Sequence, residues 1–83
     1  MDKEERRARG IRAQALLDDP LMREAFKYLE AEYTQAWAST EPGESDLREH
    51  FHKAVNILSD VRRHLGKVAA NGRLSQAELD RLR

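Results

Sequence analysis

Residues 46–71 read DLREHFHKAVNILSDVRRHLGKVAAN, and this stretch decides the fold class. Its apolar side chains recur at spacings that alternate between four and three residues, which places them on one face of an α-helix. They are Leu47, Phe51, Ala54, Leu58, Val61, Leu65 and Val68. Asn71-Gly72 is a common stop signal, because both residues tolerate the left-handed conformation that ends many helices. The pattern therefore predicts a helix over 46–71 with one continuous apolar seam.

The segment before it carries a matching pattern. Asp19-Pro20 predicts a helix start, since Asp caps helices and proline is tolerated at the first helical position. Pro42-Gly43 then interrupts the apolar spacing. A helix over 20–39 that is joined to the next helix by a short loop favours an antiparallel helical hairpin.

The two seams are expected to form the core of this hairpin, with Tyr33 placed near Phe51. Charge supports the pairing: residues 19–46 carry two basic and seven acidic side chains, whereas residues 47–83 carry eight basic and four acidic ones. Opposite charges on the two arms favour their association and fix its orientation. The predicted core residues are Met22, Phe26, Leu29, Tyr33, Trp37, Phe51, Leu58, Val61 and Leu65.

The two ends of the chain give weaker signals. Residues 1–18 are rich in Ala, Arg and Glu and predict a helix, which Gly10 weakens, so that its first turns are expected to fray. Ser75 and Glu78 have the spacing of a capping box, which predicts a separate short helix within 74–83. The whole is predicted to be all-α and one domain over 1–83, with the hairpin at 19–72.

A second, thinner stripe lies on the back of the first hairpin arm. A helix with two partly apolar faces usually has two neighbours, and a bare two-helix hairpin cannot bury its aromatic side chains from all sides. With 83 residues and no cysteine, the chain is expected to gain stability from a homo-oligomeric bundle or from a protein partner. The alternative is that residues 1–18 cover the stripe within a monomer. The candidate interaction face is Leu21, Tyr28, Ala31, Gln35 and Ala38.

The sequence lacks the parts of a catalytic, cofactor or metal site. It has no cysteine and no glycine-rich loop, and its serines fall at predicted loops, caps or a polar face. His50 and His52 point to different sides of a helix, and His64 is about 21 Å from His50 along it. We therefore expect no enzyme activity, no small-molecule substrate, no cofactor and no metal. The absence of a long apolar run or a signal-peptide pattern predicts a cytoplasmic location.

Nucleic-acid binding is a further hypothesis. Arg6, Arg7, Arg9 and Arg12 form a basic cluster near the N-terminus, but the formal net charge is zero. A typical DNA-binding domain carries a positive field over a whole face. The arginines therefore predict weak contact with nucleic acid rather than tight binding.

The runs at 15–33 (ALLDDPLMREAFKYLEAEY) and 53–65 (KAVNILSDVRRHL), with Ala36-Trp37, Pro42 and the final Gly72-Arg73-Leu74, resemble a group of small helical proteins of tailed bacteriophages and prophages. Members of this group are encoded among packaging and virion-assembly genes, and no residue roles are assigned in them. The resemblance implies a phage-encoded helical oligomerisation protein in DNA packaging or virion assembly, either small-terminase-like or accessory. It would act in the host cytoplasm or on the virion. The alternative is a small inhibitor or adaptor that binds a host protein, as an anti-defence or regulatory factor.

Overall fold

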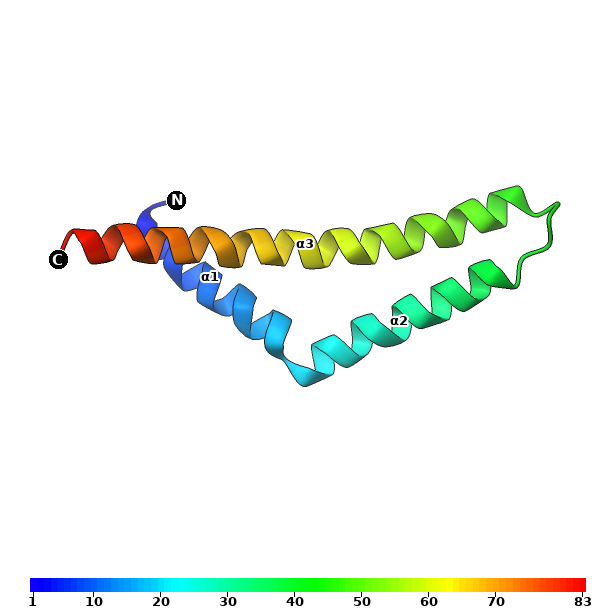
Figure 1. The fold of residues 1–83 in the computed structure, drawn as a ribbon, viewed down its shortest axis with the longest axis horizontal. Coiled ribbons are helices and arrows are strands. Elements are labelled where there is room, and N and C mark those ends of the chain that lie inside the picture. The colour runs from blue at the N-terminus through cyan, green and yellow to red at the C-terminus, as the bar shows by residue number, and fades with distance from the viewer.

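The computed structural model describes residues 1–83 and contains three helices and no strands. They are α1 (Lys3–Asp18), α2 (Pro20–Ala38) and α3 (Ser45–Arg81). The predicted all-α class is confirmed. Figure 1 shows α3 along the whole length of the molecule, with α1 and α2 forming a V whose apex, at the junction of the two helices, points away from α3.

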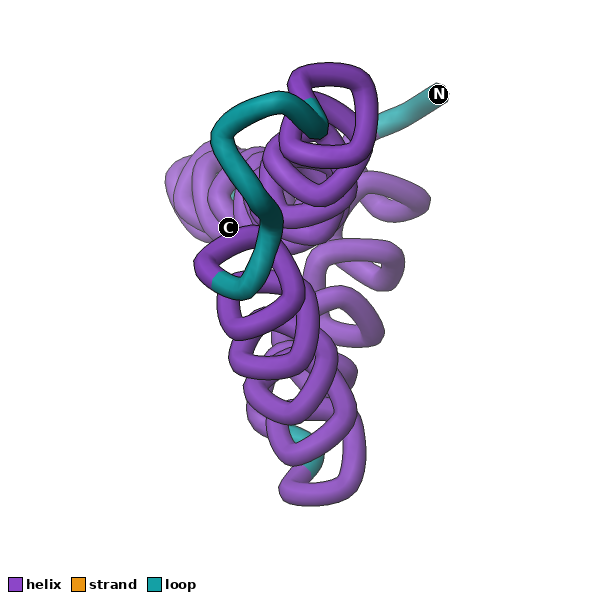
Figure 2. Tube along the Cα trace, turned by 90° about the vertical axis from the view of Figure 1, so that its right-hand side faces the viewer, coloured by secondary structure: helices purple, strands orange, loops and turns teal.

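The start of α2 follows the predicted local chemistry. The Asp19 carboxylate accepts a hydrogen bond of 2.9 Å from the Met22 amide, and Pro20 occupies the first turn. From there α2 runs to the loop at 39–44, and α3 returns from it (Figure 1). Figure 2 views the molecule from this end, with the loop nearest the reader.

The predicted stop at Asn71-Gly72 is wrong. α3 continues through it to Arg81 over 37 residues, or about 55 Å, so the separate helix predicted within 74–83 does not exist. No residue has a positive φ, so Gly72 keeps helical geometry. Glycine permits a helix to end but does not require it, and here the absence of a side chain at Gly72 serves the close approach of another helix.

The helix predicted over 1–18 corresponds to α1, which spans Lys3–Asp18. The Asp2 carboxylate caps its first turn by accepting a 2.8 Å hydrogen bond from the Glu5 amide. This hydrogen bond lowers the pKa of Asp2 below its ordinary value. α1 then packs along the C-terminal half of α3 (Figure 1).

The buried residues lie where α1 crosses α3 and not in the predicted hairpin core. Only five of 83 residues are buried, and α2 contributes none. Of the nine predicted core residues, seven are half-buried, while Trp37 and Val61 are exposed. Large side chains hold the α2 and α3 axes apart, whereas the crossing of α1 and α3 brings small residues together. The buried residues are Gly10, Ala13, Ala69, Gly72 and Ser75.

The molecule is elongated and thin. Its principal extents are 62 × 23 × 15 Å, and its radius of gyration is 17.8 Å. A compact chain of this length would have a radius of gyration of about 12 Å. The helices thus form a single layer, open to solvent on both sides. None of them includes a stretch that is both long and apolar enough to cross a membrane.

Candidate interaction surfaces

Two glycines set the distance between α1 and α3. A Cβ added to Gly10 would lie 2.6 Å from the Gly72 Cα, and one added to Gly72 would lie 3.0 Å from the Arg6 carbonyl oxygen. Both neighbours are backbone atoms, which cannot move aside without separating the helices. The glycine that was expected to weaken α1 is therefore the residue that allows α1 to dock.

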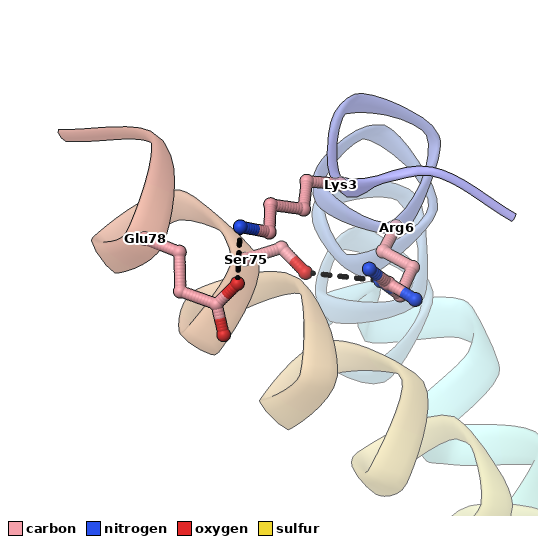
Figure 3. A network of polar contacts seen from close by, with 4 residues as sticks. All are labelled: Lys3, Arg6, Ser75 and Glu78. Carbon is pink, nitrogen blue, oxygen red and sulfur yellow. Dashed lines mark hydrogen bonds and ion pairs between the residues drawn. The ribbon is translucent and has the colours of Figure 1, made fainter. Parts of the chain in front are cut away.

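Two polar contacts hold the N-terminal half of α1 against α3 (Figure 3). The Arg6 Nε donates a 3.3 Å hydrogen bond to the Ser75 hydroxyl, and the Lys3 Nζ lies 3.0 Å from a Glu78 carboxylate oxygen. The Lys3 hydrogen bond, reinforced by its charge, lowers the pKa of Glu78. Ser75 and Glu78, which were predicted to cap a new helix, lie inside α3 and bind α1 instead.

The contacts between α2 and α3 involve larger and more exposed side chains. Tyr33 and Phe51 meet with ring centroids 6.4 Å apart, which agrees with the predicted placement of Tyr33. Arg62 forms an ion pair with Glu30, and its guanidinium carbon lies 5.3 Å from the centroid of the Phe26 ring. This arm is held by a few contacts at its edges, without an enclosed core.

An open cavity of about 440 Å³ lies between the three helices, inside the V. Its apolar wall is formed by Leu17, Met22, Phe26 and Leu65. Two of the charged groups around it have partners within the chain: Arg62 pairs with Glu30, and the Arg23 Nε donates to the Leu17 carbonyl oxygen at 3.1 Å. No serine, threonine, cysteine or histidine lines the cavity, and its remaining lining residues are polar or charged.

A second recess lies on another side of α1, between α1 and α3. We call it the basic groove; it has a volume of about 310 Å³ and is lined by Arg9, Arg12, Ala13, Leu16, His64, Leu65 and Val68. An adjoining recess that shares Arg9 and Val68 adds Met1, Arg6 and Asn71. Neither recess is lined by an acidic residue. Arg12 has no hydrogen bond or ion pair within the chain, and the only side-chain partner of Arg9 is the Met1 sulfur.

The predicted interaction face on α2 is solvent-exposed along its whole length. Leu21 is 72% exposed and Tyr28 is 65% exposed, and Ala31, Gln35 and Ala38 are exposed as well. Residues 1–18 do not cover it, because α1 packs on α3 instead. Glu24 and Glu32 occur on the same side of the helix, at helical spacing from Tyr28, and neither forms an ion pair within the chain.

The structure divides the predicted arginine cluster. Arg6 contacts Ser75 and lines the recess beside the groove, Arg9 and Arg12 line the basic groove, and Arg7 lines neither. The three histidines do not converge, and no group of three His, Cys, Asp or Glu side chains is placed to hold a metal ion.

The sequence reasoning missed the small residues of the α1–α3 crossing. A signal existed, since Ala69, Gly72 and Ser75 recur every three residues along one side of α3, and Gly10 and Ala13 do so along α1.

Comparisons of the chain with protein-family models, with curated proteins and with solved structures found no match.

Proposed function

We propose that this chain is a non-enzymatic, phage-encoded helical protein that self-associates and acts in DNA packaging or virion assembly. The observation that carries the proposal is the single-layer fold. Eleven large apolar side chains are exposed, and only two apolar residues, Ala13 and Ala69, form the buried core. A helical layer of this kind gains most by packing its open sides against another layer.

The exposed residues favour association over catalysis. They include Leu21 and Tyr28 on α2 and Ile57 and Val61 on α3. Monomeric proteins keep contiguous exposed apolar surface small, and larger surfaces mark sites of association. The assignment to packaging or virion assembly rests on the resemblance of residues 15–33 and 53–65 to small phage proteins.

Self-association is tested by light scattering coupled to size-exclusion chromatography at micromolar concentrations. The chain has a mass of 9.6 kDa, and the proposal expects an integral multiple of this mass. A strict monomer that keeps its helicity up to about 100 μM would contradict it, because contacts of biological affinity are populated in this range.

The cellular role is tested by affinity purification of the tagged protein from cells in which the phage or prophage is replicating, followed by mass spectrometry. Recovery of terminase, portal or capsid protein supports a role in packaging or assembly. Recovery of one host enzyme with none of these supports the inhibitor or adaptor alternative and overturns the proposal.

A further inference from the structure

We infer that the basic groove between α1 and α3 binds the acidic back of α2 from a second copy of this chain. The inference rests on the proposed self-association and names the two surfaces that carry it. We call the second surface the acidic ridge and define it as Leu21, Glu24, Tyr28 and Glu32.

The groove has the chemistry of a docking site for an acidic, partly apolar helix. Its lining combines the apolar side chains of Leu16, Leu65 and Val68 with the polar side chains of Arg9, Arg12 and His64. Neither Arg9 nor Arg12 has an acidic partner within the chain. An occupant with both apolar and acidic side chains would cover the apolar lining of the groove and pair with its arginines.

The acidic ridge supplies both. Leu21, Glu24, Tyr28 and Glu32 follow one another at spacings of three, four and four residues, so they line one side of α2. Leu21 and Tyr28 are the most exposed large apolar side chains of this helix, and the two glutamates beside them have no ion-pair partner. The unpaired charges of the ridge are opposite in sign to those of the groove.

The two surfaces also match in length. Residues 21–32 span about 16 Å of helix, and residues 6–16, which border the groove and its adjoining recess, span about 15 Å. The ridge of a chain cannot enter its own groove, because the opposite side of α2, at Phe26 and Tyr33, already faces α3. The occupant therefore comes from another copy. A reciprocal exchange of ridge and groove about a two-fold axis closes the assembly as a dimer.

The inference is tested by charge reversal with complementation. A groove variant carries Arg9→Glu and Arg12→Glu, and a ridge variant carries Glu24→Arg and Glu32→Arg. All four residues are exposed, so circular dichroism should show unchanged helicity. Each variant alone juxtaposes like charges, and its association constant, measured by sedimentation equilibrium, should fall at least about tenfold.

Mixing the two variants in equal amounts provides the decisive measurement. In the mixed dimer, each reversed surface faces one of opposite charge, and association should return to within about threefold of the wild-type value. Lys53→Glu with Arg63→Glu is the matched control, because it makes the same change in net charge on exposed residues of α3 outside the groove. The control variant should associate like the wild type.

Several results would overturn the inference. A groove variant that associates like the wild type removes the groove from the interface, while the proposed self-association stands. A mixture that stays dissociated shows that the two surfaces do not meet. Loss of binding to a 20-nucleotide DNA by the groove variant, with association unchanged, assigns the groove to nucleic acid. A monomeric wild type would overturn both this inference and the proposed function.

Salt provides a measurement that needs no variant. Exposed charge pairs are screened as the Debye length falls from about 10 Å at 0.1 M to about 3 Å at 1 M salt. Wild-type association should weaken between 0.05 and 1 M NaCl if unpaired charges of opposite sign meet at the interface. Association that strengthens steadily over this range would indicate an apolar interface and contradict the inference.

Discussion

The two ends of α3 are packed in opposite ways. Near its C-terminus, α1 crosses it through Gly10 and Gly72 with the two backbones in contact. Near its N-terminus, α2 faces it through aromatic and long aliphatic side chains, none of which is buried. Side-chain size explains the difference: small residues let two helices enclose their contact, whereas large ones need helices on further sides to cover them.

The crossing should be the part most sensitive to added volume. Gly10→Ala combined with Gly72→Ala would place methyl groups on backbone atoms 2.6 to 3.0 Å away, and we expect a loss of roughly 3 kcal/mol in the free energy of unfolding. The measurement is urea denaturation followed by circular dichroism. Retained stability would show that α1 does not dock through these glycines.

Gly66→Ala is the matched control for this change. Gly66 is also within α3, but an added Cβ there has no neighbouring atom within 4 Å. Removing a glycine from a helix interior without a clash should stabilise the protein by about 0.5–1 kcal/mol. Effects of the same sign at Gly66 and at the glycines of the crossing would contradict the distinction between the two ends.

The aromatic arm should respond less to the loss of a large side chain. Phe26 is half-buried. In protein dilute enough to be monomeric, Phe26→Ala should therefore lower the free energy of unfolding by roughly 1.5 kcal/mol, about half the value for a fully buried phenylalanine. The measurement is again urea denaturation. A cost of 3–5 kcal/mol would mean that the arm has a closed core in the single chain.

The smallest effect is expected from the ion pair between Lys3 and Glu78. Because the folded-state pKa of Glu78 is lowered, its stabilising contribution is present at neutral pH and is lost as pH falls through that pKa. Glu78→Gln should therefore lower the melting temperature slightly at pH 7 and leave it unchanged at pH 3. Asp80→Asn is the control, since Asp80 contacts only Gln76 and Arg83 of its own helix end; an identical pH dependence in both variants would contradict the assignment.

The difference between the two ends of α3 also shows which parts of the fold could be predicted from the sequence. The spacing of large apolar residues predicted the helical class and the meeting of Tyr33 with Phe51, and the Asp19-Pro20 pair predicted the start of α2. It could not locate the core, because periodicity shows which side of a helix is apolar but not how closely another helix approaches. At Gly72 and Ser75, local rules for helix ends predicted a stop and a cap, whereas both residues lie inside α3 and contact α1.

Of the two candidate surfaces, only the exposed face of α2 could be predicted from the sequence. The exposed face around Leu21 and Tyr28 was found from its spacing alone, since helical periodicity defines the back of α2. The basic groove was not found, because Arg9 and Arg12 are about 50 residues from His64 in the sequence. Only the docking of α1 on α3 brings these residues to one recess.

On the proposed self-association, α1 and α3 form a stable unit within one chain, whereas α2 depends on a second copy. Amide hydrogen exchange above and below the concentration of assembly tests this most directly, since it reports local stability along the chain. We expect the amides of residues 6–13 and 69–76 to stay protected at both concentrations, and those of residues 21–33 to lose protection on dilution. Equal protection of all three segments at both concentrations would contradict the claim.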